Sequence, residues 1–253
     1  MIGRIAACGR RRGTRADPAW QLRWLPVCAS TETVLDRWLA APGTPEQLRQ
    51  PRAVLAGRQR FGYGQRGRVW LAPRGGVWLS AALPWPADPT QAAAPGLAAA
   101  VALAQELQAL GVAVRLKWPN DLLVLDQHGS PRKLAGLLPR LRLRGARVRW
   151  ARLGLGLNGC NRVPTGAIAL ADCLGGWAAQ PERLWPLALR ALHTAGGNAH
   201  RAEAVRRQAE ALLWWPPEPV WHRGLAWQPL GLDRGGGLRL GRSGATTVLE
   251  RLF

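Results

Sequence analysis

Residues 112–121, with the sequence Val-Ala-Val-Arg-Leu-Lys-Trp-Pro-Asn-Asp, decide which fold the chain is expected to adopt. Apolar residues recur at every second position up to Trp118, which is the period of a strand whose two faces differ. Lys117 then points away from the apolar face. Pro119 lacks an amide donor and ends the strand, and Asn120 and Asp121 follow it. Functional sites gather at strand ends in α/β sheets, which makes these two residues candidates, although an ordinary turn explains the same sequence.

The flanking segments predict a mixed α/β fold. Helical spacing of apolar residues indicates a short helix after Ser30 and Thr31, a buried helix over 91–110 that ends at Gly111, and helical structure over 181–213 with a break at Gly196 and Gly197. Strands are expected at residues 69–71, 77–83, 122–125, 133–143 and 148–157. Pro139 should place the end of the 133–143 strand at an edge or a bend.

The chain divides into three parts by composition. The first 16 residues carry five arginines and no acid, so residues 1–24 are expected to be a basic tail. Residues 25–215 are expected to form the main α/β domain. The segment Trp214–Pro219 contains three prolines and cannot continue a helix, which makes it a boundary. Beyond it, residues 219–253 offer short strands between glycines and are expected to form a small β domain.

The charge of the chain is unusual. Its 253 residues carry 35 basic and 15 acidic side chains, a net charge of +20, and Lys117 and Lys133 are the only lysines. A coding bias toward arginine is one explanation, and binding to nucleic acid or to an acidic protein is the other. Because arginine is scattered through the whole sequence, the pattern favours long-range attraction of a partner over a dedicated nucleic-acid groove.

Several classes of protein lack support in the sequence. No apolar run reaches the roughly 18–20 residues that span a bilayer, and the N-terminal sequence lacks a secretory signal. The four cysteines and four histidines show no spacing typical of a zinc site or a disulfide framework. Motifs of hydrolases, kinases and P-loop NTPases do not appear. We therefore expect a cytoplasmic protein that does not enter membranes.

A glycine-rich segment, Gly62–Arg68, could bind an anion. Its sequence Gly-Tyr-Gly-Gln-Arg-Gly-Arg lets the backbone approach a phosphate closely, and Arg66 and Arg68 add guanidinium donors. The segment matches a dinucleotide-binding pattern, but a strand and not a helix is expected after it, which excludes the Rossmann fold. A flexible hairpin with solvated arginines is the alternative interpretation.

The segment Lys133–Gly136, Lys-Leu-Ala-Gly, contains the second lysine of a chain that otherwise uses arginine. A compact ammonium group on a slim stem can follow a moving charge where a planar guanidinium would clash. We therefore expect Lys133 to be functional, with chance retention of two lysines as the alternative. Gly154–Gly159 ends a strand with small residues and Asn158, and either a ligand contact or a plain strand exit explains it.

These motifs, in this order and spacing, resemble the biotin protein ligases, also called biotin–[acetyl-CoA-carboxylase] ligases. The resemblance covers about residues 25–160 and depends most on Lys117–Asp121 followed by Lys133–Gly136. It implies a mixed-sheet catalytic domain related to class II aminoacyl-tRNA synthetases, followed by a small SH3-like β domain. The family activates biotin with Mg-ATP to biotinyl-5′-AMP and passes biotin to one lysine of a carrier. The implied ligands are ATP, biotin and Mg²⁺, and the implied partner is the biotin carboxyl carrier protein of acetyl-CoA carboxylase.

The resemblance also implies roles for individual residues. Lys133, Arg66 and Arg68 would be catalytic cations at the junction of carboxylate and phosphate. Biotin would contact Ser30, Thr31, Glu32, Gln59, Tyr63, Gly64, Gln65, Lys133 and Gly136. ATP and the adenylate would contact Arg66, Arg68, Trp70, Lys117, Asn120, Asp121, Lys133 and Asn158. No protein ligand for a metal is expected.

The sequence departs from the family pattern at three positions. Tyr63 and Gln65 stand where many members have arginine, which puts retention of the adenylate in question, and Glu32 stands where asparagine is common. The residues before Ser30 are too few for a helix-turn-helix, so we expect no specific DNA binding. A lipoate ligase of the same superfamily and a basic single-strand nucleic-acid binder are the alternatives. The sequence leaves a homodimer open.

Overall fold

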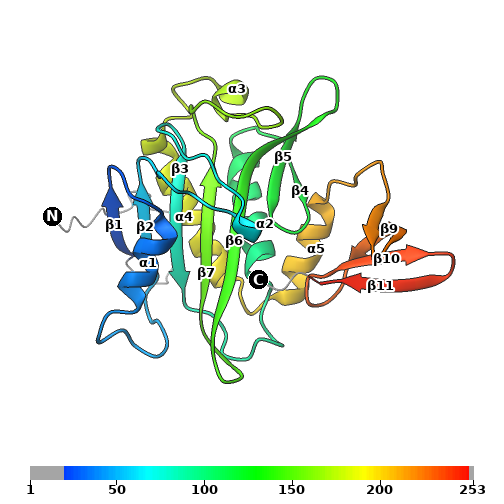
Figure 1. Cartoon of the computed structure of the whole chain (residues 1–253), viewed down its shortest axis with the longest axis horizontal. Coiled ribbons are helices and arrows are strands. Elements are labelled where there is room, and N and C mark those ends of the chain that lie inside the picture. The colour runs from blue at the N-terminus through cyan, green and yellow to red at the C-terminus, as the bar shows by residue number, and fades with distance from the viewer. Residues whose placement is uncertain (1–19, 251–253) are drawn as a thin grey trace.

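The computed structural model describes residues 20–250. Its main body is a seven-stranded sheet in the spatial order β1-β2-β3-β7-β6-β5-β4 (Figure 1). β1 pairs with β2 in parallel, and the other neighbours are antiparallel, so the mixed α/β fold is confirmed. The strands are β1 (Gln21–Leu25), β2 (Arg52–Ala56), β3 (Val77–Leu83), β4 (Val114–Lys117), β5 (Asp121–Leu125), β6 (Pro131–Arg144) and β7 (Arg147–Leu157).

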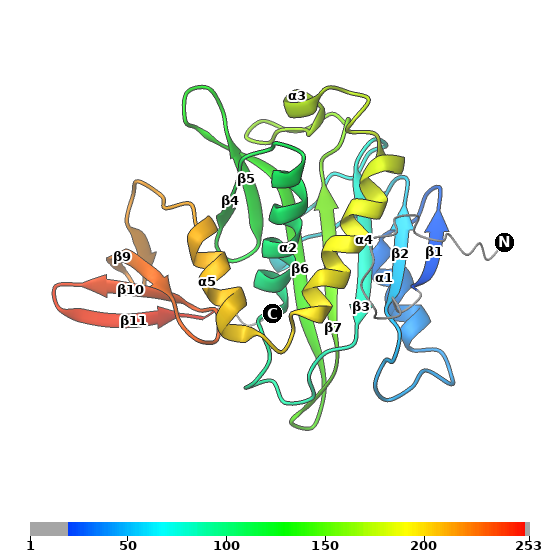
Figure 2. The same cartoon turned by 180° about the vertical axis from the view of Figure 1, so that it is seen from behind.

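Helices cover the two faces of this sheet unequally. α2 (Pro95–Ala109) and α4 (Pro181–Gly197) lie across one face, in front in Figure 2, with α5 (Ala202–Leu212) beside them. α2 is almost entirely buried, because its alanines allow close approach to the sheet and to α4. α1 (Thr31–Leu39) packs against β2 and β3 on the opposite face. The candidate site lies on this second face, beside α1.

Most expected helices are confirmed, with shifted ends. α2 begins at Pro95, four residues later than expected, because proline suits the first turn of a helix and not its interior. The helix over 181–213 does break, but Gly196 and Gly197 stay within α4, and α5 begins at Ala202. Further short helices are α3 (Ala171–Leu174) and the 3₁₀ turn η1 (Gln65–Gly67).

The strand expected over 69–71 is wrong. Val69 and Ala72 make only isolated bridges, to Tyr63 and Gln59, because the segment folds back on itself as an irregular hairpin outside the sheet. The expectation for Pro139 is confirmed. β6 pairs with β5 only as far as Gly136, so Pro139 lies in a part of β6 that has β7 as its single strand neighbour.

The N-terminal boundary also shifts. Gln21–Leu25 forms β1 and adds an edge strand to the main sheet, although residues up to 24 were expected to belong to a basic tail. The remainder of that expected tail, residues 1–19, lies outside the described residues.

A separate four-stranded antiparallel sheet follows α5. Its order is β11-β10-β9-β8, and Trp214–Pro219 connects it to α5 without forming helix or strand, as the prolines predict. Its strands are β8 (Val220–His222), β9 (Leu225–Leu232), β10 (Leu238–Arg242) and β11 (Ala245–Leu249). A small C-terminal β unit was expected, and this sheet confirms it.

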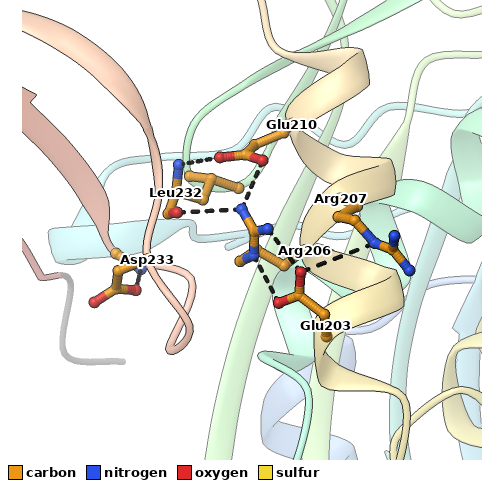
Figure 3. Close-up of polar contacts among 7 residues, drawn as sticks. Glu203, Arg206, Arg207, Glu210, Leu232 and Asp233 are labelled. Carbon is orange, nitrogen blue, oxygen red and sulfur yellow. Dashed lines mark hydrogen bonds and ion pairs between the residues drawn. The ribbon is translucent and has the colours of Figure 1, made fainter.

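An arginine on α5 fastens the small sheet to the main body (Figure 3). Arg206 binds both carboxylate oxygens of Glu203, at 2.7 and 2.9 Å, and one oxygen of Glu210 at 2.6 Å. The second oxygen of Glu210 accepts the backbone N–H of Leu232, at the end of β9, at 2.7 Å. Each of the four carboxylate oxygens therefore has a donor. Gly231 completes the junction, since a Cβ there would lie 2.6 Å from Glu210 Oε1.

Within residues 20–250, the structure contains no helix with the length and apolar character needed to cross a membrane.

Candidate active site

A cavity of about 340 Å³ lies on the face of the main sheet that α1 shares. It is bordered by α1, by the hairpin around Gly62–Arg68, and by the central strands of the sheet. Most of the residues predicted from the sequence line it. They are Ser30, Thr31, Glu32, Gln59, Tyr63, Gly64, Gln65, Arg68, Trp70, Lys117, Asn120, Asp121, Lys133 and Gly136.

The register of the sheet explains why residues far apart in sequence meet there. Trp78 of β3 lies opposite Gly156 of β7, Gly156 lies opposite Gly136 of β6, and Gly136 lies opposite Asp121 of β5. Side chains of paired residues point to the same face of a sheet. Asp121, Gly136 and Gly156 of this row line the cavity, and the central members of the row are glycines.

A β-bulge puts Lys133 on the cavity face. β5 and β6 pair with a register shift, so that Leu122 lies opposite Ala135 while Leu123 lies opposite Lys133. Leu134 is the extra residue, and Leu134 and Ala135 are both buried in the core beneath the helices. In a regular strand Lys133 would share a face with Ala135, but the bulge turns it to the same face as Gly136.

Lys133 has two partners at the cavity. Its Nζ lies 2.8 Å from Asp121 Oδ2 and 4.9 Å from the centre of the Trp70 ring. The Trp70 ring lies over the two paired glycines: a Cβ on Gly136 would come within 2.8 Å of the ring, and one on Gly156 within 2.5 Å. The small residues in both motifs are thus explained by the space that Trp70 occupies.

The α1 end of the cavity is built from hydroxyl and amide groups. Gln59 Oε1 accepts the backbone N–H of Thr31 at 2.7 Å and its hydroxyl at 3.0 Å. The Thr31 hydroxyl also lies 2.8 Å from the Ser80 hydroxyl in the middle of β3. These contacts fix the first turn of α1 against the sheet.

The hairpin around Gly62–Arg68 brings one of its two arginines to the cavity. Arg68 lines the cavity, but Arg66 does not. Arg66 adopts a left-handed conformation, with φ of 57°, at the exposed tip of the hairpin. The expected convergence of three cations is therefore found for Lys133 and Arg68 only. Tyr63 also lines the cavity, where burial, and secondly the charge of Glu32, raise the pKa of its hydroxyl.

Asn158 lies beneath the cavity and does not line it. Its side-chain amide donates to the carbonyls of Ile168 at 3.2 Å and Lys133 at 3.4 Å. Asn120 lines the cavity, but its amide donates to the Leu137 carbonyl at 2.6 Å. Both side chains thus hold the backbone around Lys133 and Gly136.

Lys117 and Trp118 link the cavity to the C-terminal part of the chain. Lys117 Nζ lies 5.9 Å from the centre of the Trp214 ring, in the segment after α5. The Trp118 indole donates to the carbonyl of Gly236, in the turn between β9 and β10, at 2.9 Å. The small sheet is therefore in direct contact with one edge of the cavity.

Buried polar atoms without partners concentrate at this cavity. Nine buried side-chain nitrogen or oxygen atoms within residues 20–250 have no hydrogen-bond partner, and five belong to residues that line the cavity. Such atoms are rare in folded proteins, since each costs free energy unless a ligand or water satisfies it. The five are Ser30 Oγ, Glu32 Oε1, Gln65 Nε2, Trp70 Nε1 and Asp121 Oδ1.

Two residues of this region were not selected in the analysis of the sequence. Ser80 is fully buried, and a serine within an otherwise apolar strand was the available signal. Arg152 is 8% exposed and precedes the glycines of β7, but one arginine among 33 carries no signal by itself. The cavity lining also includes Gly154, Gly156, Leu138 and Val69.

Comparison with known proteins identifies the family. Residues 25–158 match the model of the biotin/lipoate A/B protein ligase family, which is more than half of the chain. The chain belongs to this family. The matched range contains α1, the Gly62–Arg68 hairpin, both lysines and the glycines of β7, so the family match and the cavity coincide.

Curated relatives carry ligase names. The chain is 38% identical over 139 residues to the bifunctional ligase/repressor BirA of Salmonella typhimurium, covering 53% of this chain and 39% of the relative. It is 36% identical over 118 residues to the biotin–[acetyl-CoA-carboxylase] ligase of Paracoccus denitrificans, covering 46% and 47%. The chain thus matches less than half the length of either relative.

Solved structures of similar fold cover more of the chain. The biotin protein ligase from Aquifex aeolicus in complex with biotin and ATP superposes with a TM-score of 0.68 at 22% identity, covering 90% of this chain and 94% of that one. The Helicobacter pylori biotin acetyl coenzyme A carboxylase synthetase gives a TM-score of 0.56 at 20% identity, with 90% and 98% covered. Both the main sheet and the small sheet therefore follow the architecture of this ligase family.

Proposed function

We propose that this chain is an ATP-dependent ligase that activates biotin as biotinyl-5′-AMP and transfers it to a lysine of a biotin carboxyl carrier protein, that of acetyl-CoA carboxylase. The proposal depends above all on how polar groups divide along the cavity. Neutral polar groups and one carboxylate gather beside β3 and α1, at Ser30, Thr31, Glu32, Gln59 and Ser80. Cationic groups line the rest of the cavity, at Lys117 on β4, Lys133 on β6 opposite β5, and Arg68 on the hairpin.

Biotin has a matching division of groups. Its ring system carries a urea, with two N–H donors and a carbonyl acceptor, and its carboxylate lies at the far end of an aliphatic chain. β3 and β5 are three strand spacings apart, about 14 Å, so the cavity is long enough to separate the two ends. We infer that the urea lies beside α1 and that the carboxylate lies near Lys133.

The first reaction joins two anions. A carboxylate oxygen of biotin attacks the α-phosphorus of ATP, the new O–P bond forms, and the bond to the pyrophosphate oxygen breaks. Fixed cations stabilise the charge that grows on the phosphoryl oxygens. Lys133 and Arg68 are the candidates for this role, whereas Arg66, at the hairpin tip, requires a movement of the hairpin to reach the same place. No general base is needed, because the attacking carboxylate is already ionised.

The second reaction transfers the acyl group. The uncharged amine of the carrier lysine attacks the acyl carbon, the amide bond forms, and AMP leaves with the bonding electrons while the amine loses a proton. Tyr63 and Gln65 line the cavity where the family resemblance places arginines. Neutral side chains attract the adenylate less than cations do, so we expect this chain to release more of the intermediate.

Mg²⁺ fits the cavity as the partner of the nucleotide. No group of three or more His, Cys, Asp or Glu residues between 20 and 250 could hold a metal ion by itself. Mg²⁺ usually binds through one or two carboxylates together with substrate phosphates, and Asp121 Oδ1 is a buried oxygen without a partner. Asp121 is therefore the candidate protein ligand. The ion supplies positive charge that screens the triphosphate.

Exposed arginines flank the cavity lining along the chain. Arg58 and Arg60 lie on either side of Gln59, and Arg66 and Arg68 lie in the hairpin. A basic rim of this kind accelerates encounter with an acidic carrier domain more than it sets specificity. Rising salt concentration should then slow carrier biotinylation far more than adenylate formation. Equal slowing of both reactions would remove this role for the charge.

One experiment tests the proposed function directly. The protein is mixed with biotin, Mg-ATP and a biotin carrier domain, and the carrier is analysed by mass spectrometry for biotin on its acceptor lysine. A carrier with that lysine changed to arginine is the control. Lipoate in place of biotin, and a single-stranded oligonucleotide in a binding assay, test the two alternatives. Modification by lipoate alone, or binding of the oligonucleotide with no ligation, would overturn the proposal.

A further inference from the structure

Arg152 lies beneath the α1 end of the cavity. It belongs to β7, where it is paired with Ala82 of β3 and Arg140 of β6, two positions before Gly154 on the same face. An arginine so deeply buried is unusual unless its donors are satisfied by acceptors. Its surroundings show which acceptors these are.

Two carboxylates from successive turns of α1 bind Arg152. Its Nη2 donates to Glu32 Oε2 at 2.7 Å and to the Glu32 carbonyl at 3.3 Å, and its Nη1 donates to Asp36 Oδ1. Glu32 and Asp36 are four residues apart and lie on the same side of the helix. The guanidinium therefore fixes both the position of α1 and the rotation of the Glu32 carboxylate.

One carboxylate oxygen of this network has no hydrogen-bond donor among the described residues. Glu32 is 4% exposed and lines the cavity, and its Oε1 has no hydrogen-bond partner within residues 20–250. A Cβ at Gly154 would lie 3.1 Å from this oxygen, so the glycine gives it room. A buried carboxylate oxygen that lacks a donor costs free energy, and a ligand with an N–H group removes that cost.

We propose that Glu32 Oε1 accepts a hydrogen bond from a urea N–H of biotin, and that Arg152 is the positioning residue that aims it. The inference rests on the proposed function and adds to it a determinant of specificity. A substrate whose ring carries no N–H donor, such as the dithiolane of lipoate, would bury this oxygen without a partner. Sites built to satisfy a hydrogen bond reject analogues that lack it much more strongly than apolar pockets do.

The sharpest variant is Glu32→Gln, because it keeps the shape of the side chain. Arg152 has donors only, so the amide oxygen of the glutamine must face Arg152 and its NH₂ must face the cavity. A donor then meets the urea N–H. We expect the KM for biotin in adenylate formation to rise about tenfold or more, the size of one lost hydrogen bond to a charged group, while the KM for ATP stays within twofold.

A second variant separates positioning from simple loss of charge. Arg152→Met should also raise the KM for biotin, because the Glu32 carboxylate loses its anchor. In the double variant Glu32→Gln with Arg152→Met, the glutamine amide is free to turn its oxygen to the cavity. The KM for biotin should then be lower than in Glu32→Gln alone. A double variant as weak as the sum of the single variants would overturn the positioning role.

Arg206→Met is the matched control, because it removes an arginine from a comparable network away from the cavity (Figure 3). It should lower the melting temperature and leave both KM values unchanged. If the wild-type protein makes no adenylate from biotin, the proposed function fails. If it does, and Glu32→Gln has the wild-type KM for biotin, the proposed function stands and the role of Glu32 and Arg152 is wrong.

Discussion

Arg152 binds two carboxylates of α1 from the neighbouring strand β7, and Arg206 binds two carboxylates of its own helix, α5, but the two networks differ in which polar atoms keep a partner. At the junction of α5 and β9, all four carboxylate oxygens bound by Arg206 or the Leu232 amide have a donor (Figure 3). Between β7 and α1, within residues 20–250, Glu32 Oε1 has no donor and Arg152 Nε has no acceptor. Both networks consist of the same chemical groups, so composition does not distinguish them.

The difference teaches how to separate a structural ion pair from a functional one. A network that satisfies itself can only hold parts of the fold together. A buried network that leaves an acceptor without a donor is costly in isolation, and its persistence is explained when a ligand completes it. Changes around the cavity should therefore alter activity more than stability, and changes at the junction should do the opposite.

Gly156→Ala should have the largest effect on activity. Its Cβ would lie 2.5 Å from the Trp70 ring, which must then leave the cavity floor. Overpacking of this kind costs about 1–3 kcal/mol, so we expect adenylate formation to fall by about tenfold to a hundredfold. Pyrophosphate release measures the rate. A wild-type rate in a folded variant would show that Trp70 is not part of the site.

Lys133→Arg tests the cationic end of the cavity. The charge is kept, but a planar guanidinium cannot occupy the space of an ammonium between Asp121 and the Trp70 ring. We expect adenylate formation to fall at least about tenfold, or about 1.4 kcal/mol of transition-state stabilisation. The melting temperature serves as the control. Near-normal rates would refute the role assigned to Lys133.

Gly231→Ala is the counterpart of Gly156→Ala at the junction. Gly231 has a φ of 142°, and its added Cβ would lie 2.6 Å from Glu210 Oε1. Backbone strain of about 1–3 kcal/mol should lower the melting temperature by about 2–12 °C in a chain of this size. The KM for biotin should not change. A large loss of activity without loss of stability would erase the contrast between the two regions.

Acid should weaken the junction slightly. Hydrogen bonding from Arg206 holds the pKa of the Glu203 carboxyl below its ordinary value of 4.5. A lowered pKa in the folded protein adds stability above about pH 4.5, and this stability is lost as the pH falls through the folded-state pKa. The difference in melting temperature between the wild type and Arg206→Met should therefore shrink between pH 6 and pH 3. A difference that does not depend on pH would contradict this pairing.

Local patterns in the sequence predicted much of the fold. The alternation around Val114 and Leu116, the proline after it, and the helical spacing of α1, α2 and α4 all report periodicities that the final structure keeps. The strand expected over 69–71 failed because three apolar residues also suit a hairpin that crosses the cavity. The conformation of such a short segment depends on its tertiary contacts, and local sequence patterns do not reveal those contacts.

The lining of the cavity was predictable where residue type and position in a motif agreed, as for Lys133, Asp121 and Trp70. Residues that become neighbours only through strand register or packing could not be predicted. The pairing of Gly136 with Gly156 depends on the alignment of β6 with β7, and the place of Arg152 beneath Glu32 depends on the packing of α1 on the sheet. Asn158 was chosen for its position at a strand end, but its amide is used by neighbouring carbonyls.

The bulge at Leu134 ties the chemistry of the cavity to the number of residues in β6. Adding one more residue between Lys133 and Gly136, with the bulge kept, would reverse the alternation and carry the ammonium group through the sheet, into the alanine-lined layer under α2. A chain with that insertion could keep every strand and helix and still lack a cation where the nucleotide is expected. In this protein, the number of residues between Lys133 and Gly136 is therefore constrained more strictly than the composition of the strand.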